Sequence, residues 1–124
     1  MKDSRLLISV VDDDESIRES LPALIYEFGF AARTFPSAEE FLASDYLNHT
    51  ECLILDVAMP GMSGPDLQRE LSILGKSIPI IFITGHGDET VRPRLLKEGA
   101  VECLHKPFSD ADLSSALNAA LRSD

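Results

Sequence analysis

Short apolar runs and longer amphipathic segments alternate from one end of the sequence to the other. The apolar runs predict five strands, at residues 5–11, 31–35, 51–55, 78–83 and 100–104. The segments between and after these runs repeat their apolar residues at helical spacing, so each predicts a helix. This alternation predicts an α/β domain in which helices cover both faces of a parallel sheet.

Local signals refine two of the expected helices. Ser37 with Glu40 three residues later is a capping-box pattern, which predicts the start of the second helix. In the third helix, Leu67, Leu71 and Leu74 recur at helical spacing and are expected to face the sheet.

The composition is typical of one soluble domain, and we expect it to span residues 1–124. The chain is 44% hydrophobic and 26% charged, with a formal net charge of −10 that disfavours direct binding to nucleic acids or anionic membranes. No apolar run is long enough to span a membrane, so we expect a cytoplasmic protein. Cys52 and Cys103 lie in apolar stretches without metal-ligand spacing, which predicts core packing.

Polar residues follow four of the five predicted strands. Asp12 and Asp13 follow the first strand, Asp56 the third, Thr84 the fourth and Lys106 the fifth. Parallel strands end at a common edge of the sheet, and open α/β sheets bind their ligands at the carboxyl ends of the strands. These side chains are therefore the candidate site residues.

Three carboxylates at one edge need a compensating charge. Two unit charges 4 Å apart repel by about 4 kcal/mol at an effective dielectric of 20. A divalent cation that prefers oxygen ligands removes this cost, and Mg²⁺ also leaves room for phosphate oxygens. We therefore expect Asp12 and Asp13 to bind Mg²⁺ and Asp14 to cap the following helix.

Asp56 stands alone after its strand and is followed by a turn that keeps it accessible. It is the candidate nucleophile for forming an acyl phosphate. Lys106 and the hydroxyl of Thr84 are candidates to contact the phosphoryl oxygens, since phosphoryl transfer requires mainly positioning and charge neutralisation.

Four segments, "VVDDDES", "LILDVAMPGMSG", "IIFITGHGD" and "HKPF", resemble the motif blocks of receiver domains of bacterial two-component response regulators. They occur in the family's order and spacing, and their wording is closest to the branch of nitrogen-fixation-type regulators. The resemblance implies a flavodoxin-like (βα)5 doubly wound parallel sheet with strand order 2-1-3-4-5.

The resemblance also implies a function. Asp56 would accept a phosphoryl group from a sensor histidine kinase or a phosphotransfer protein, in a Mg²⁺-dependent reaction that switches partner binding or dimerisation. Thr84 and Lys106 would contact the phosphoryl group, and the Lys106–Pro107 bond would be cis. Such a domain catalyses only its own phosphorylation and dephosphorylation, so it is not a metabolic enzyme.

The implied Mg²⁺ ligands are Asp12, Asp13, Asp56 and the backbone carbonyl of Ala58. We also expect Ala58 and His86 to flank the phosphoryl group and to control the access of water to it.

Two positions depart from the family pattern. Cys103 stands where receivers usually have Phe or Tyr, three residues before the lysine. Pro93 lies where the fourth helix begins or runs. The resemblance implies that Cys103 replaces the aromatic residue that reads out phosphorylation in the family. It also implies that Pro93 affects the face formed by the fourth helix, the fifth strand and the fifth helix, through which the family commonly signals and forms homodimers.

Two other functions are alternatives, one that keeps the fold and one that shares the chemistry. A pseudo-receiver would bind partners without phosphorylation. A phosphohydrolase with an aspartyl nucleophile would use a DxD motif after the first strand, which Asp12 and Asp14 formally supply. A flavin- or nucleotide-binding module is disfavoured, because the aspartates would repel the ligand's phosphates.

Overall fold

Within residues 5–85 and 90–121, which the computed structural model of the chain describes, five parallel strands form one sheet in the order β2-β1-β3-β4-β5. The strands are β1 Leu7–Val11, β2 Ala31–Phe35, β3 Thr50–Asp56, β4 Ile80–Thr84 and β5 Glu102–His105. The predicted flavodoxin-like fold and its strand order are confirmed.

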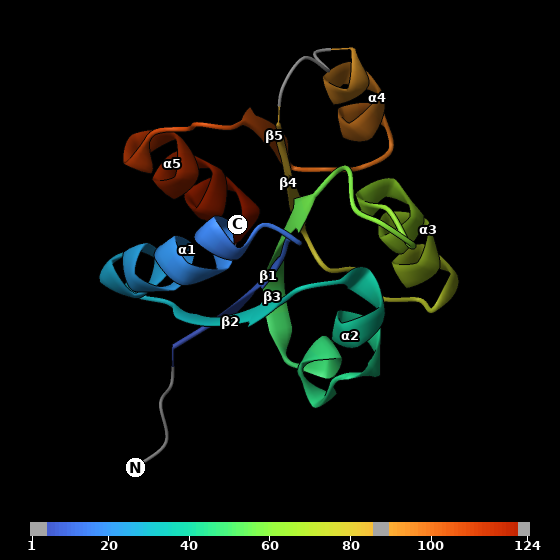
Figure 1. Cartoon of the computed structure of the whole chain (residues 1–124), viewed down its shortest axis with the longest axis horizontal. Helices are drawn as coiled ribbons and strands as arrows, with labels where there is room; N and C mark the ends of the chain where they lie inside the picture. Colours follow the sequence, from blue (N-terminus) through green and yellow to red (C-terminus); the bar gives the residue numbers. More distant parts are fainter. Residues whose placement is uncertain (1–4, 86–89, 122–124) are drawn as a thin grey trace.

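Helices cover both faces of the sheet, with α1 and α5 on one face and α2, α3 and α4 on the other (Figure 1). The helices are α1 Glu15–Glu27, α2 Ala38–Ala43, α3 Gly64–Ile73, α4 Val91–Lys97 and α5 Asp110–Leu121. A short 3-10 helix, Asp45–Asn48, follows α2 and was not predicted from the periodicity. None of the helices formed by the described residues is long and apolar enough to cross a lipid bilayer.

The sheet separates two hydrophobic cores. Leu53 and Leu55 of β3 point into the core under α2, α3 and α4, whereas Cys52 and Ile54 point into the core under α1 and α5. Because both faces of the centre of this strand are buried, its residues 52–55 are continuously apolar. Cys103 is also buried, so the predicted core role of both cysteines is confirmed. Burial raises the pKa of the Cys52 thiol to about 12.

Several local predictions are wrong: the first and fourth strands begin at Leu7 and Ile80, two residues later than predicted, and two further differences have a clear structural reason. Leu74 does not face the sheet, because α3 ends at Ile73 and leaves Leu74 49% exposed at the C-cap. The fifth strand does not begin at residue 100. The backbone N–H of Ala100 instead donates to the carbonyl of Leu95 and closes the end of α4.

Candidate functional site

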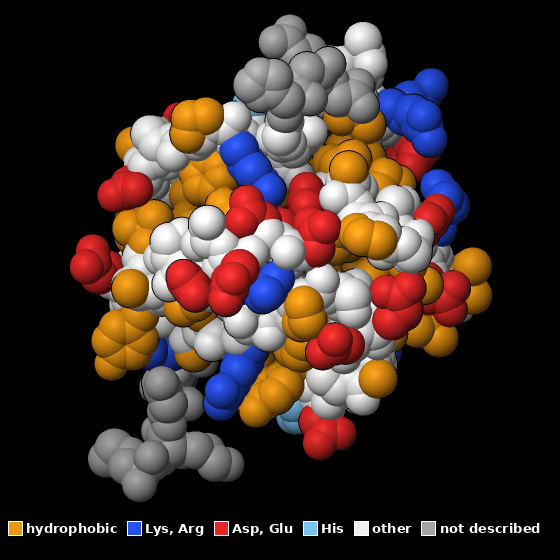
Figure 2. Space-filling model, in the orientation of Figure 1, with side chains coloured by type: hydrophobic (Ala, Val, Ile, Leu, Met, Phe, Trp, Pro, Cys, Tyr) orange, Lys and Arg blue, Asp and Glu red, His pale blue; other side chains and the backbone are white. Residues whose placement is uncertain are grey.

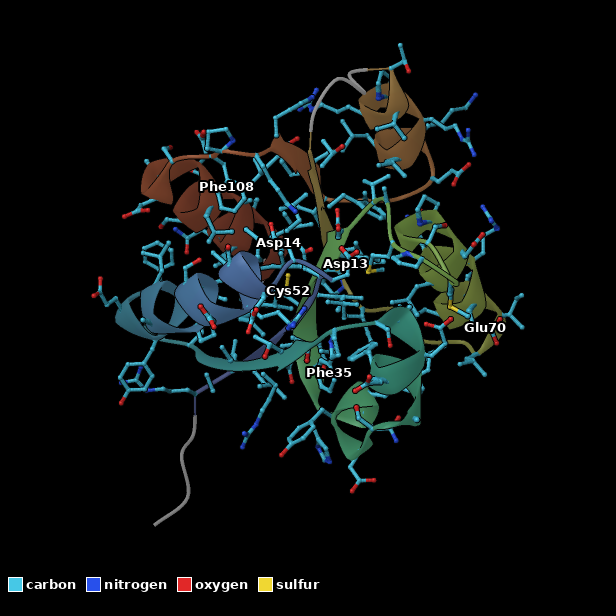
Figure 3. The ribbon with its side chains drawn as sticks, viewed as in Figure 1. Asp13, Asp14, Phe35, Cys52, Glu70 and Phe108 are labelled. Atoms are coloured by element: carbon cyan, nitrogen blue, oxygen red, sulfur yellow. The ribbon has the colours of Figure 1, made fainter. Side chains whose placement is uncertain are left out.

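The carboxyl ends of β1 and β3 bring three acids together. These strands are neighbours, and their last paired residues are Val11 and Leu55, so Asp12 and Asp56 lie side by side at the carboxyl edge of the sheet. One carboxylate oxygen from each of Asp12, Asp13 and Asp56 lies within 4.8 Å of the others. Figure 3 shows Asp13 next to the end of β3.

The turn between β1 and α1 is fixed by hydrogen bonds. Asp12 Oδ1 accepts a hydrogen bond from the backbone N–H of Asp14 at 2.9 Å. Asp14 Oδ1 accepts one from the N–H of Ser16 at 2.9 Å and so caps α1, as predicted. From α1, Arg18 donates to the backbone carbonyl of Asp12 at 2.9 Å. Of the three consecutive aspartates, Asp14 therefore caps α1, whereas Asp12 and Asp13 belong to the acid cluster.

Lys106 reaches the acids from the end of β5. Its Nζ lies 3.0 Å from Asp12 Oδ2 and 4.0 Å from Asp56 Oδ1. Its backbone N–H donates to the carbonyl of Thr84 at 2.8 Å, and its bond to Pro107 is cis, as the family resemblance implied. Lys106 is therefore close enough to compensate part of the charge of both buried acids.

Thr84 ends the strand next to β3. Its predecessor Ile83 pairs with Asp56, so Thr84 lies one residue further toward the carboxyl edge, and its side chain is buried. Ala58 is exposed in the loop between β3 and α3, two residues after Asp56. His86 lies outside the described residues.

A close backbone contact fixes the start of α3 against the site. A Cβ atom on Gly64 would lie 2.3 Å from the backbone oxygen of Asp56 and 3.0 Å from the ring of Phe82. Ser63 and Asp66 form a capping box directly around this glycine. The glycine was not predicted as a site residue, although the sequence signal was present in the pattern Ser-Gly-Pro.

Burial and like charge shape the electrostatics. Burial, followed by the negative charge of Asp12, raises the pKa of Asp56 to about 7, although Lys106 acts in the opposite direction. Burial alone lowers the pKa of Lys106, but pairing with Asp12 and Asp56 outweighs burial and raises it above its ordinary value. Figure 2 shows acidic side chains gathered near the middle of the face that is turned to the viewer, with a basic side chain beside them.

The donor set fits a hard divalent cation. Three carboxylates offer oxygen ligands close to one another, which is the chemistry that Mg²⁺ prefers. Asp12 Oδ2 is buried and pairs with Lys106 Nζ at 3.0 Å, and a carboxylate oxygen has a second lone pair that a cation can use. The cluster can therefore hold a magnesium ion.

Comparison with known proteins agrees with this geometry. Residues 8–118 match the family described as the response regulator receiver domain. Response regulator protein TodT of Pseudomonas putida is 44% identical over 122 residues, which are 98% of this chain and 54% of TodT. Nodulation protein W of Bradyrhizobium diazoefficiens is 47% identical over 121 residues, which are 98% of this chain and 53% of that protein. The chain spans about half the length of these curated relatives.

Solved structures give the same result. The response regulator StyR superposes with a TM-score of 0.86 at 43% identity, over 95% of this chain and 60% of StyR. FixJ-N superposes with a TM-score of 0.83 at 39% identity, over 97% of this chain and 94% of FixJ-N. The strand order, the acid cluster at its carboxyl edge and these matches lead to one conclusion: the chain belongs to the receiver domain family of two-component response regulators and is similar to FixJ.

Proposed function

We propose that this domain, residues 1–124, is a phosphoacceptor switch in which Asp56 takes a phosphoryl group from the phosphohistidine of a sensor histidine kinase or a phosphotransfer protein. One observation carries the proposal. Asp56 is grouped with two further carboxylates and lies 4.0 Å from the ammonium of Lys106, at the edge where this fold binds ligands.

The chemistry follows from the groups present. A carboxylate oxygen of Asp56 attacks phosphorus, the phosphorus–nitrogen bond breaks, and its electron pair returns to the imidazole nitrogen. Lys106 pairs with oxygen atoms of the transferred phosphoryl group, and the hydroxyl of Thr84 donates a hydrogen bond to a further oxygen of the same group. Asp12, Asp13, Asp56 and the backbone carbonyl of Ala58 would hold Mg²⁺, which supplies positive charge to the phosphoryl oxygens when bound.

The local contacts favour Asp56 over Asp12 as the nucleophile. Asp12 Oδ1 already accepts the N–H of Asp14, and Asp12 Oδ2 faces Lys106 at 3.0 Å. A phosphohydrolase that used the first aspartate of a DxD pattern would need Asp12 to be free to attack. These contacts therefore disfavour that alternative.

Asp56→Asn is expected to abolish phosphorylation, because an amide oxygen is too weak a nucleophile to attack phosphorus. Intact-mass analysis after treatment with acetyl phosphate and Mg²⁺ should show one phosphoryl group on the wild type and none on the variant. Wild type that remains unlabelled, or a variant that is labelled equally, would contradict the proposal and favour a pseudo-receiver. Sustained turnover of a phosphomonoester would favour a phosphohydrolase.

Phosphorylation would change the face formed by α4, β5 and α5. Arg92 of α4 donates two hydrogen bonds to Glu102 Oε1 on β5, at 3.1 and 2.6 Å, and the same oxygen accepts the backbone N–H of Cys103 at 2.9 Å. The two Arg92 bonds join the helix to the strand at Glu102, four residues before Lys106. Homodimerisation through this face is the output we propose, and the net charge of −10 argues against direct nucleic-acid binding by the domain.

A further inference from the structure

The loop between β3 and α3 carries the proposed carbonyl ligand Ala58, and both of its ends are fixed by the backbone. The N–H of Val57 donates to the carbonyl of Ile83 at 3.0 Å, which continues the sheet. The N–H of Gly64 donates to the carbonyl of Val57 at 3.0 Å and closes the loop at the start of α3. Between these two bonds lie residues 58–63, including an exposed Ala58.

A carboxylate from another element holds the middle of this loop. Glu39 of α2 accepts a hydrogen bond at Oε2 from the backbone N–H of Met62, at 3.0 Å. The preceding Gly61 has a φ of +75°, and a Cβ atom there would lie 2.7 Å from the same oxygen of Glu39. The carboxylate therefore packs directly against the turn as well as accepting its N–H.

We propose that Glu39 is a positioning residue for the proposed magnesium site, acting through the loop that carries the Ala58 carbonyl. The inference rests on the proposed function, because it needs this carbonyl to be a ligand. Partners that orient ligands from outside the coordination sphere typically change metal affinity when they are lost. Glu39 acts in this way through the backbone, because it accepts the N–H of Met62, which lies four residues after Ala58 in the sequence.

Two substitutions separate contact from charge. Glu39→Gln removes the negative charge but keeps an oxygen that can accept the Met62 N–H. Glu39→Asp keeps the charge but shortens the side chain by one methylene, which moves the carboxylate away from Met62. If Glu39 positions the loop by contact, the Glu39→Gln variant should keep its Mg²⁺ affinity and the Glu39→Asp variant should bind Mg²⁺ more weakly. If only the charge of Glu39 matters, Glu39→Gln should weaken Mg²⁺ binding and Glu39→Asp should preserve it.

The measurement is the Mg²⁺ dissociation constant by isothermal titration calorimetry on the whole chain. Glu39→Ala and Glu39→Asp are expected to raise it about tenfold, the lower end of the range for outer-shell partners, and Glu39→Gln to leave it within about twofold. Glu40→Ala changes the exposed neighbouring residue on the same helix and serves as the matched control, with no expected change.

A second readout follows the contact itself. Hydrogen exchange of the Met62 amide should accelerate in Glu39→Ala and Glu39→Asp, while the thermal midpoint stays near that of Glu40→Ala. Wild type that binds Mg²⁺ with the same affinity as Glu39→Ala would overturn this inference and leave Asp56 phosphorylation standing. An equal loss of Mg²⁺ affinity in Glu39→Gln and Glu39→Ala would also overturn the inference. Wild type that binds no Mg²⁺ would overturn both this inference and the proposed function.

Discussion

Gly64→Ala is expected to destabilise the domain by about 3 kcal/mol, which is the upper range for adding a methyl group to a packed site. The added Cβ would lie 2.3 Å from the backbone oxygen of Asp56, a distance that real Cβ atoms do not adopt, and 3.0 Å from Phe82. Neither neighbour can yield easily, because the oxygen belongs to the backbone at the end of β3 and the ring is fully buried. Urea unfolding followed by circular dichroism measures the change.

Gly85→Ala is the matched control. A Cβ atom on Gly85 meets no described atom within 4 Å, so this variant should stay within about 0.5 kcal/mol of wild type. The clash at Gly64 should also displace the backbone of Asp56, the proposed phosphoacceptor, and slow labelling by acetyl phosphate. Equal stability of the two variants would contradict the packing argument.

The architecture and the grouping of the acids were predictable because they depend on periodicity and topology. Alternating strands and helices specify a parallel sheet, and residues that follow parallel strands share one edge. Asp12 and Asp56 are 44 residues apart in the sequence, yet the neighbouring positions of β1 and β3 bring their carboxylates together. The order of the strands came from the family resemblance and not from the periodicity.

Contacts that depend on the close approach of separate segments were not predictable in this way. The Cβ position of Gly64 matters only because α3 begins against the backbone of Asp56. Glu39 and Met62 are 23 residues apart, and although Met62 lies in a quoted motif block, nothing in the sequence pairs its backbone N–H with Glu39. The periodicity of each segment shows which face is buried, but it contains no information about which exposed carboxylate meets which loop.

In Mg²⁺-free buffer, Asp56→Asn is expected to be more stable than wild type by about 2–4 kcal/mol at pH 8 and by about 1–2 kcal/mol at pH 5, and close to wild type only near pH 4. Burial and the charge of Asp12 raise the pKa of Asp56 from 3.8 to about 7. Between these values the folded chain holds a proton that the unfolded chain has lost. Stability from Asp56 is therefore lost as pH rises from about 4 to 7, and the neutral asparagine avoids this loss.

Denaturant unfolding at several pH values, with and without Mg²⁺, measures the effect. Mg²⁺ should stabilise wild type at pH 8 and have little effect on Asp56→Asn, since the variant lacks one of the three clustered carboxylates. Asp66→Asn is a control of opposite sign, because backbone hydrogen bonding at Ser63 lowers the pKa of Asp66 and its contribution is lost as pH falls. If the free energies of unfolding of wild type and Asp56→Asn differ by the same amount from pH 5 to pH 8, Asp56 is ionised in the folded chain over this whole range. The acid cluster would then have no repulsion that a bound cation could reduce.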